Sequence, residues 1–200
     1  MKREDLEELH FITSVRNVTS VVKYGILSYS RAGRIEHTSL AKADVQDRRA
    51  KVRVENGRPL HDYANLYICG RNPTLYLMIR NAGGHQHLAV VTVSTAVLDL
   101  PDVVITDQNA ASDWCRFSSS PQGLRIVDRD AVFAEYWTHP DDRIAEWRHK
   151  SVKCAEVLVP DQVGRQYLTG LKVSSSQTAA NLASDGCDLP ISVDTHLFFR

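Results

Sequence analysis

The sequence predicts a mixed α+β domain in which helices flank a central β-sheet. Short apolar runs rich in β-branched and aromatic residues, each bounded by Gly, Pro, Asp or Asn, are typical of strands. Helical patterns occur among these runs without a regular strand-helix alternation, which favours α+β over α/β. The chain has 200 residues and 43% hydrophobic content. This is enough for one buried core, so we expect a single domain over residues 1–200.

The N-terminal stretch "ELHFITSVRNVTSVVKYGILS" is expected to form a strand and then a helix. Residues 8–12 read as the strand, and Thr13 and Ser14 as the cap of a helix whose valines recur on one side. Gly25 is expected to end this helix as a left-handed residue. The polar, arginine-rich segment that follows predicts one short helix at 42–52.

Five runs are the candidate strands: "NLYICG", "TLYLMIR", "HLAVVTVS", "DVVITD" and "CAEVLV". Helices are predicted at 74–81, 128–137 and 175–183. The first of these overlaps "TLYLMIR", where strand and helix remain alternatives because short apolar runs fit both periods.

Charge and motifs exclude several classes of protein. Lys and Arg total 24, as do Asp and Glu, so no global field indicates a nucleic-acid or membrane binder, although a local basic patch remains compatible. The four cysteines form no CxxC pair, and the start of the chain has no apolar signal region. We expect a cytoplasmic protein without a membrane span, disulfide or metal. Phosphate-loop, dinucleotide-binding, zincin and hydrolase-elbow motifs are absent.

Glu156 in "KCAEVLVP" begins an otherwise apolar strand, where an unpartnered carboxylate would cost several kcal/mol to bury. In an alternating strand 154–159 it shares a face with Cys154 and Leu158. The simpler interpretation is an edge-strand glutamate at the solvent end. The alternative is a carboxylate at a cleft, where it would bind a sugar hydroxyl or stabilise positive charge.

Other segments carry possible binding chemistry. Arg48 and Arg49 in "VQDRRAK" suit a diphosphate, or else form a solvated basic face. Residues 136–153 interleave aromatic and basic side chains, a composition typical of single-strand nucleic-acid binding, although Trp137 could instead anchor a helix in the core. His85 and His87 are half a metal site at most and read better as surface residues.

Six motifs in order resemble the DarT toxins, a family of DNA ADP-ribosyltransferases. They are "FITSVRNVTSVVKYGILSYSRA", "VQDRRAKV", "LHDYANLYICGRNPTLY", "CRF", "EYW" and "KCAEVLV", and they span about residues 9 to 160. The resemblance implies an ADP-ribosyltransferase fold, with a split, mixed β core and an NAD⁺-binding cleft. It also implies transfer of ADP-ribose from NAD⁺ onto a base in single-stranded DNA, and a macrodomain antitoxin as partner.

By position, the resemblance makes Glu156 and Arg49 the catalytic residues. The residues expected to bind NAD⁺ are His10, Thr13, Asn17, Gly25, Leu27 and Arg49. The histidine of the family motif stands two residues before the threonine, at the position of Phe11, whereas His10 stands three before it. One step along a strand reverses the face, so a local bulge would be needed to restore the contact.

The segment 138–155 corresponds to the target-recognising loop of this fold. Candidates for contacts with DNA are Arg71, Arg116, Trp137, Trp147, Arg148 and Lys153. The form of "YANLYICGRNPTLY" resembles the guanine-modifying branch, so we expect guanine rather than thymine, and a monomer. The alternatives are an RNA-directed or protein-directed transferase, a non-catalytic NAD⁺ or ADP-ribose-binding module, and a cofactor-free nucleic-acid-binding protein.

Overall fold

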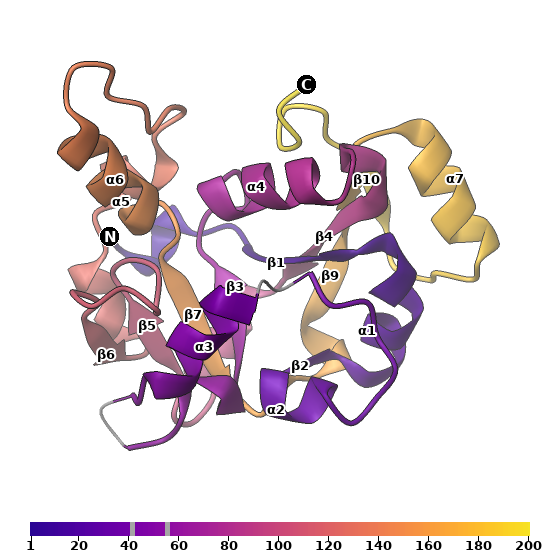
Figure 1. Ribbon diagram of the computed structural model, residues 1–200. Helices are drawn as coiled ribbons and strands as arrows, with labels where there is room; N and C mark the ends of the chain where they lie inside the picture. The colour runs from indigo at the N-terminus through magenta and orange to yellow at the C-terminus, as the bar shows by residue number, and fades with distance from the viewer. Residues whose placement is uncertain (41–42, 55–56) are drawn as a thin grey trace.

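A computed structural model describes residues 1–40, 43–54 and 57–200 (Figure 1). Within these ranges, one eight-stranded sheet has the order β10-β9-β4-β1-β3-β7-β5-β6. Its strands are β1 (Leu9–Ser14), β3 (Tyr63–Tyr67), β4 (Leu88–Val93), β5 (Val104–Thr106), β6 (Phe117–Ser119), β7 (Glu156–Pro160), β9 (Leu168–Val173) and β10 (Ile191–Val193). The pair β9 and β10 is parallel and the other ladders are antiparallel, so the sheet is mixed as predicted.

The sheet consists of two halves that meet at one point. Between β1 and β3 the register within the described residues is the single pair His10↔Tyr67, whereas β3 pairs with β7 over five positions. The first half is therefore β10-β9-β4-β1 and the second is β3-β7-β5-β6. This is the split β core that the resemblance to the DarT family implies. A separate ribbon pairs β2 (Ile26–Leu27) with β8 (Gln162–Val163).

Helices cover both faces of the sheet, in the arrangement seen in Figure 1. They are α1 (Val18–Tyr24), α2 (Tyr29–Ala32), α3 (Ala43–Lys51), α4 (Pro73–Asn81), α5 (Arg129–Phe133), α6 (Arg143–Val152) and α7 (Ser176–Ser184). On one face, alternate strand residues pack with Val18 and Val21 of α1 and with Leu182 of α7. On the other face, they pack with Leu75 of α4 and Phe198 near the chain end.

The ambiguous segment "TLYLMIR" is a helix. The side chain of Asn72 accepts a hydrogen bond from the backbone N–H of Leu75, and Pro73 occupies the first turn of α4. Both features start helices rather than strands. The prediction at 175–183 is confirmed by α7, and the one at 128–137 is too long because α5 ends at Phe133. For the helix expected at 42–52, α3 covers 43–51, and position 42 lies outside the described residues.

The N-terminal helix begins later than expected. Thr13 and Ser14 complete strand β1, a 3₁₀ turn over Val15–Asn17 follows, and α1 starts at Val18. Ser14 does act as a cap, because its Oγ accepts the backbone N–H of Arg16. Gly25 follows α1 with φ 78° and ψ −172°. Its φ is positive as predicted, but its ψ lies outside the left-handed helical region.

Some elements were not predicted. The strands β2, β6, β8, β9 and β10 are short, polar or interrupted by glycine, so they lack the apolar runs that marked the central strands. The segment 138–155, expected to be a loop, contains helix α6. Asp142 caps this helix by accepting the backbone N–H groups of Ile144 and Ala145.

No helix within the described ranges combines the length and apolar content needed to cross a bilayer.

Gly25 provides a test of how closely α1 and β8 pack. A Cβ at Gly25 would lie 2.1 Å from the carbonyl oxygen of Val163, and its backbone conformation belongs almost exclusively to glycine. We expect Gly25→Ala to lower the free energy of unfolding by about 3 kcal/mol or more in chemical denaturation. The control is Gly186→Ala, which also has a positive φ but no atom within 4 Å of the new Cβ. It should lose about 1 kcal/mol, and equal losses in the two variants would contradict the close approach.

Candidate functional site

Glu156 is the first residue of β7 and is fully buried, with 0% of its surface exposed. Because β7 lies between β3 and β5, the interpretation of Glu156 as an edge-strand residue at the solvent end is wrong. Its neighbour across the ladder is Tyr67. Residues paired in this way share a face, so both side chains lie on the side of the sheet that α4 covers. The glutamate is therefore held inside the protein.

Arg49 of α3 supplies the charge that balances Glu156. Its Nη1 donates to Oε1 over 3.1 Å and its Nη2 donates to Oε2 over 3.2 Å, a bidentate pair between residues 107 positions apart. Arg49 itself is 8% exposed. Burial lowers the pKa of Arg49, but the Glu156 carboxylate outweighs burial and raises it above its ordinary value. Removing one partner of such a pair typically costs 3–5 kcal/mol, about a third of a domain's stability.

Two further groups hold Glu156 from the side of β5. The backbone N–H of Ala110 donates to Oε1 over 2.9 Å, and the Glu156 backbone N–H donates to Thr106 Oγ1 over 2.9 Å. Thr106 in turn donates to the carbonyl of Gln108 over 2.7 Å. Sequence reasoning missed both Thr106 and Ala110. The aspartate that closes "DVVITD" indicated a strand end, but nothing in the sequence shows that a backbone N–H will point at a carboxylate.

The loop that carries Ala110 is closed by an ion pair at its base. Arg116 Nε donates to Asp107 Oδ2 over 2.7 Å, and the Arg116 backbone N–H donates to Asp107 Oδ1 over 2.9 Å. Arg116 was predicted to contact DNA, and its side chain is well exposed. The structure gives it a second role, because its bonds to Asp107 fix the loop over Glu156. Contact with DNA by Arg116 stays a prediction.

Other ionisable groups near Glu156 are neutral at ordinary pH. Burial, with a smaller contribution from Glu156, raises the pKa of Cys115 to about 12. Burial also raises the pKa of Cys154 to about 11 and shifts the pKa of Tyr67 well above its ordinary value. None of these groups competes with Glu156 for Arg49. The pair thus combines one negative and one positive charge in otherwise neutral surroundings.

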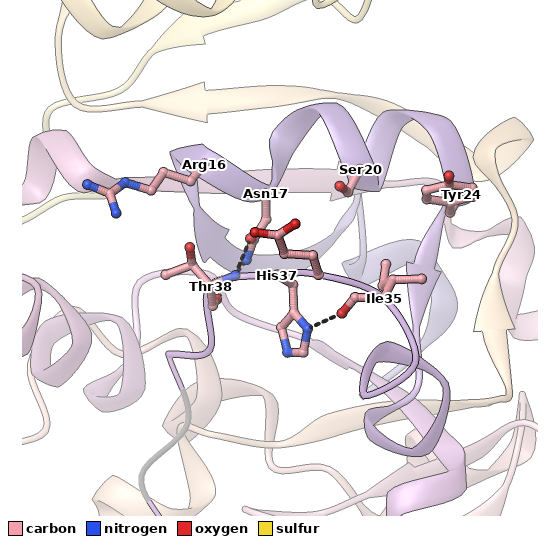
Figure 2. A pocket seen from close by; sticks show the side chains of 8 residues that line it. Arg16, Asn17, Ser20, Tyr24, Ile35, His37 and Thr38 are labelled. Carbon is pink, nitrogen blue, oxygen red and sulfur yellow. Dashed lines mark hydrogen bonds between the residues drawn. The ribbon is translucent and has the colours of Figure 1, made fainter.

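Asn17 lines a large cavity on the other half of the fold, and Thr13 is its hydrogen-bonded neighbour. The cavity measures about 710 Å³ and is lined by Asn17, Ser20, Tyr24 and residues 35–38, among others (Figure 2). The Asn17 amide clamps this second segment, since Nδ2 donates to the carbonyl of Thr38 over 2.9 Å and Oδ1 accepts its N–H over 2.8 Å. Asn17 Nδ2 also reaches Thr13 Oγ1 over 3.3 Å. The clamped segment leads along the chain to α3 and Arg49.

The remaining residues predicted to bind NAD⁺ are divided between two places. Gly25 and Leu27 join α1 to the β2-β8 ribbon. His10 lies in a continuous ladder from Leu9 to Ser14 against β4, so the bulge that would bring it onto the face of Thr13 does not occur. His10 instead shares a face with Tyr67 and Glu156 across three adjacent strands. Its Nε2 contacts Glu8 over 3.2 Å, and its buried Nδ1 has no partner among the described residues.

The predicted DNA-binding residues also separate into two groups. Trp147, 63% exposed, and Arg148 project from α6, which has no buried residue. Trp137 packs edge-on against Tyr76 and Phe199, so the idea that it anchors local structure has support. Lys153 is buried beside Trp137, and Arg71 stacks on Phe199. The six DNA contacts stay predictions.

His85 and His87 lie in a 3₁₀ turn before β4. In the part of the chain that the structure describes, no group of three or more His, Cys, Asp or Glu side chains could hold a metal ion.

One family model and several known proteins match this chain. The model of a family described as "ssDNA thymidine ADP-ribosyltransferase, DarT" matches residues 10–199. A fusion protein of a DNA ADP-ribosyl transferase and a DNA ADP-ribosyl glycohydrolase from Thermosipho africanus is 32% identical over 201 residues, which is 96% of this chain and 49% of that protein. A DNA ADP-ribosyl transferase from Thermus sp. strain 2.9 is 32% identical over 160 residues, with 76% and 73% covered.

Solved structures agree on the fold. Thermosipho africanus DarTG in complex with ADP-ribose matches with a TM-score of 0.84 and 30% identity, over 96% of this chain and 51% of that one. Thermus sp. 2.9 DarT matches in its complex with ADP-ribosylated single-stranded DNA, with a TM-score of 0.82 and 23% identity, and in its complex with NAD⁺, with 0.79 and 22%. Both Thermus matches cover 99% of this chain and 100% of that one. This chain spans about half the length of the Thermosipho protein.

The bond between Thr106 and the Glu156 backbone can be tested by stability. Thr106→Val keeps the shape of the side chain but removes the hydroxyl, which leaves the buried N–H of Glu156 without an acceptor. We expect the free energy of unfolding to fall by about 1–3 kcal/mol in urea or guanidinium titrations. Thr19→Val, an exposed threonine on α1, is the control and should change stability by less than about 0.5 kcal/mol. If Thr106→Val is as stable as this control, the bond does not hold Glu156.

Proposed function

The chain belongs to the DarT family of single-stranded-DNA ADP-ribosyltransferases, and from that membership we propose that it transfers ADP-ribose from NAD⁺ to a DNA base. The observation that carries this proposal is the buried Glu156 carboxylate, held by Arg49 at the start of a central strand. The family match includes both residues, because it extends over residues 10–199. Nicotinamide is the leaving group, and the DNA base is the acceptor.

The cavity beside Asn17 is suited to part of NAD⁺. Its volume of about 710 Å³ lies within the range of small-molecule sites, and polar side chains contribute to its walls. Thr13 and Glu156 point to opposite faces of the sheet. A ligand that reaches both has to pass between the half-sheets, beyond the His10↔Tyr67 pair. We therefore place the dinucleotide between the Asn17 clamp and Glu156, with Gly25 and Leu27 supporting the cavity from the end of α1.

Glu156 would act through one carboxylate oxygen. Oε1 already accepts two hydrogen bonds, from Arg49 and Ala110, whereas Oε2 accepts one, from Arg49. Each oxygen offers about two lone-pair sites, so Oε2 keeps one for a ribose hydroxyl. From this position the carboxylate stabilises the positive charge that develops at the anomeric carbon as nicotinamide leaves.

Arg49 would control access to that oxygen. Its guanidinium covers the carboxylate, and Glu156 has no exposed surface of its own. A ribose hydroxyl reaches Oε2 when the guanidinium turns partly away, and the diphosphate of NAD⁺ offers it a new bidentate acceptor. Arg49 thus pairs with the carboxylate before the substrate binds and balances the phosphates afterwards.

The acceptor base would attack the anomeric carbon through a ring or exocyclic nitrogen. The C–N bond to nicotinamide breaks as the new C–N bond forms, and the base nitrogen gives up a proton to Glu156 or to water. A stacked base cannot bring its nitrogen to a buried carbon, so single-stranded DNA is the preferred substrate. The exposed Trp147 and Arg148 of α6 are suited to hold the bases and phosphates around the target.

The proposed transfer has two candidate acceptor bases, guanine and thymine. The guanine preference expected from "YANLYICGRNPTLY" has no support in the comparisons, since the matching family is described by thymidine. We propose to decide it with single-stranded oligonucleotides that carry one thymine or one guanine among other bases. Mass spectrometry after incubation with NAD⁺ identifies the modified base. RNA and protein in the same assay test the alternative transferases.

A macrodomain antitoxin remains the proposed partner. The Thermosipho relative joins a DNA ADP-ribosyl glycohydrolase to its transferase in one chain. A separate protein of that activity would protect a cell that produces this chain.

Glu156→Gln tests the catalytic assignment while keeping the size of the side chain and one carbonyl acceptor. The amide cannot balance Arg49 or the developing positive charge, so we expect the rate of ADP-ribose transfer to an oligonucleotide to fall by at least about 10²-fold. Glu7→Gln, an exposed site, is the control and should retain full activity. Thermal unfolding with and without NAD⁺ separates the catalytic loss from a loss of structure. Wild-type rates in a folded Glu156→Gln protein would rule out the role.

A further inference from the structure

A second cavity of about 330 Å³ lies beside the start of β7, away from the Asn17 clamp. Its walls come from the end of β3, the segment after α5 and the C-terminal segment, and include Cys69, Arg71, Phe133, Lys153 and His196. Lys153 stands three residues before Glu156, and Cys69 stands two residues after its partner Tyr67. Three residues of chain span at most about 10 Å, so the backbone of Lys153 lies within about 10 Å of the backbone of Glu156.

Arg71 brings an uncompensated cation to this cavity. Its guanidinium carbon lies 4.2 Å from the centre of the Phe199 ring, so the ring supports the plane of the group. The buried Nε of Arg71 has no hydrogen-bond partner among the described residues. No carboxylate in those ranges forms an ion pair with Arg71. A stacked guanidinium with unused donors is arranged to receive a planar or tetrahedral anion.

Lys153 brings a second cation. It is 1% exposed, and its Nζ donates to the carbonyl of Val132 over 3.0 Å and to Cys69 Sγ over 3.7 Å. An ammonium group has three protons, so one remains for a ligand. Burial lowers the pKa of Lys153, and the nearby charge of Arg71 lowers it further. Two like charges in one cavity repel each other, and an anion between them would remove this repulsion.

The acidic groups at the cavity do not supply the anion between Arg71 and Lys153. Asp194 accepts the backbone N–H of Leu197 over 2.9 Å, and its other oxygen lies 3.9 Å from Lys172 Nζ. Glu135 is exposed and makes no ion pair in the described part of the chain. Aromatic surfaces border the two cations, since Phe133 is partly exposed and the Trp137 ring is 5.9 Å from Lys153 Nζ. Cations beside exposed rings suit the phosphate and base of an unpaired nucleotide.

We propose that this cavity is a subsite for a backbone phosphate of the single-stranded DNA substrate, bound by Arg71 and Lys153. The proposal rests on the proposed function, since it assumes that DNA reaches Glu156. NAD⁺ also carries phosphates, but its placement by the Asn17 clamp leads to Glu156 from the other half-sheet. The phosphate bound here belongs to a nucleotide close to the target base, and it fixes the register of the strand.

The test compares Arg71→Gln with wild type in the binding of a labelled single-stranded oligonucleotide, without NAD⁺. Fluorescence anisotropy at several salt concentrations gives the slope of log affinity against log salt. Loss of one phosphate contact should reduce the magnitude of this slope by about 0.7. Arg80→Gln, an exposed arginine on the same helix as the Asn72 cap, is the control and should keep the wild-type slope. An unchanged slope for Arg71→Gln overturns the subsite.

A second measurement locates the phosphate. Oligonucleotides with one uncharged methylphosphonate linkage, moved along the strand, should show one position that weakens binding to wild type but not to Arg71→Gln. If Arg71→Gln does not fold, the same methylphosphonate series is measured on wild type and on Arg71→Lys. The proposal is overturned if no linkage position weakens binding to wild type. NAD⁺ should raise the Tm of Arg71→Gln as much as that of wild type. A smaller rise would assign the site to NAD⁺ and overturn the proposal.

Transfer of ADP-ribose to the unmodified oligonucleotide by wild type, measured in parallel, reports on the proposed function separately. If the wild-type protein transfers ADP-ribose but Arg71→Gln keeps the wild-type salt slope, the subsite is rejected and the proposed function stands. A wild-type protein that neither binds nor modifies the oligonucleotide would reject both.

Discussion

The burial of one carboxylate governs much of this structure. Glu156 has no contact with solvent, and an isolated charge in that position would cost far more than a domain's net stability. Three elements therefore converge on it: α3 brings Arg49, β5 brings Thr106, and the loop after β5 brings the backbone of Ala110. The ion pair of Asp107 and Arg116 in turn closes that loop. The need to pair and hydrogen-bond the buried carboxylate therefore holds together elements that are far apart in sequence.

The same interaction links the stability of the fold to the proposed active site. A buried ion pair contributes little net stability over a well-packed apolar pair, but removing one member leaves a charge without a partner. Arg49 and Glu156 therefore depend on each other, because either charge would be buried without a partner if the other were removed. The neutral phenol and thiols of Tyr67, Cys115 and Cys154 add no competing charge. The Glu156 carboxylate is thus held next to one cation, the Arg49 guanidinium.

Local patterns predicted the central strands, and the family resemblance implied the split sheet and singled out Glu156 and Arg49, whose catalytic role stays a prediction. They could not predict the bond between Arg49 and Glu156, because 107 residues separate them and only the fold brings them together. The helix α4 was ambiguous by periodicity, although Asn72 before Pro73 is a helix-start signal that could have decided it. Helix α6 had a comparable signal in Asp142. The contribution of Ala110 is a backbone group, which no side-chain pattern reveals.

Helix α6 is anchored to the rest of the fold through its C-terminal half, where Val152 packs against the core and His149 contacts the carbonyl of Ala131. It has no buried residue, its start is capped by Asp142, and Glu146 and Lys150 pair one turn apart on its surface. Substitutions at exposed positions such as Ile144 and Trp147 should therefore change stability by less than about 0.5 kcal/mol. If α6 contacts DNA as proposed, exchanging its exposed side chains would change which nucleic acid is held without disturbing the buried pair of Arg49 and Glu156.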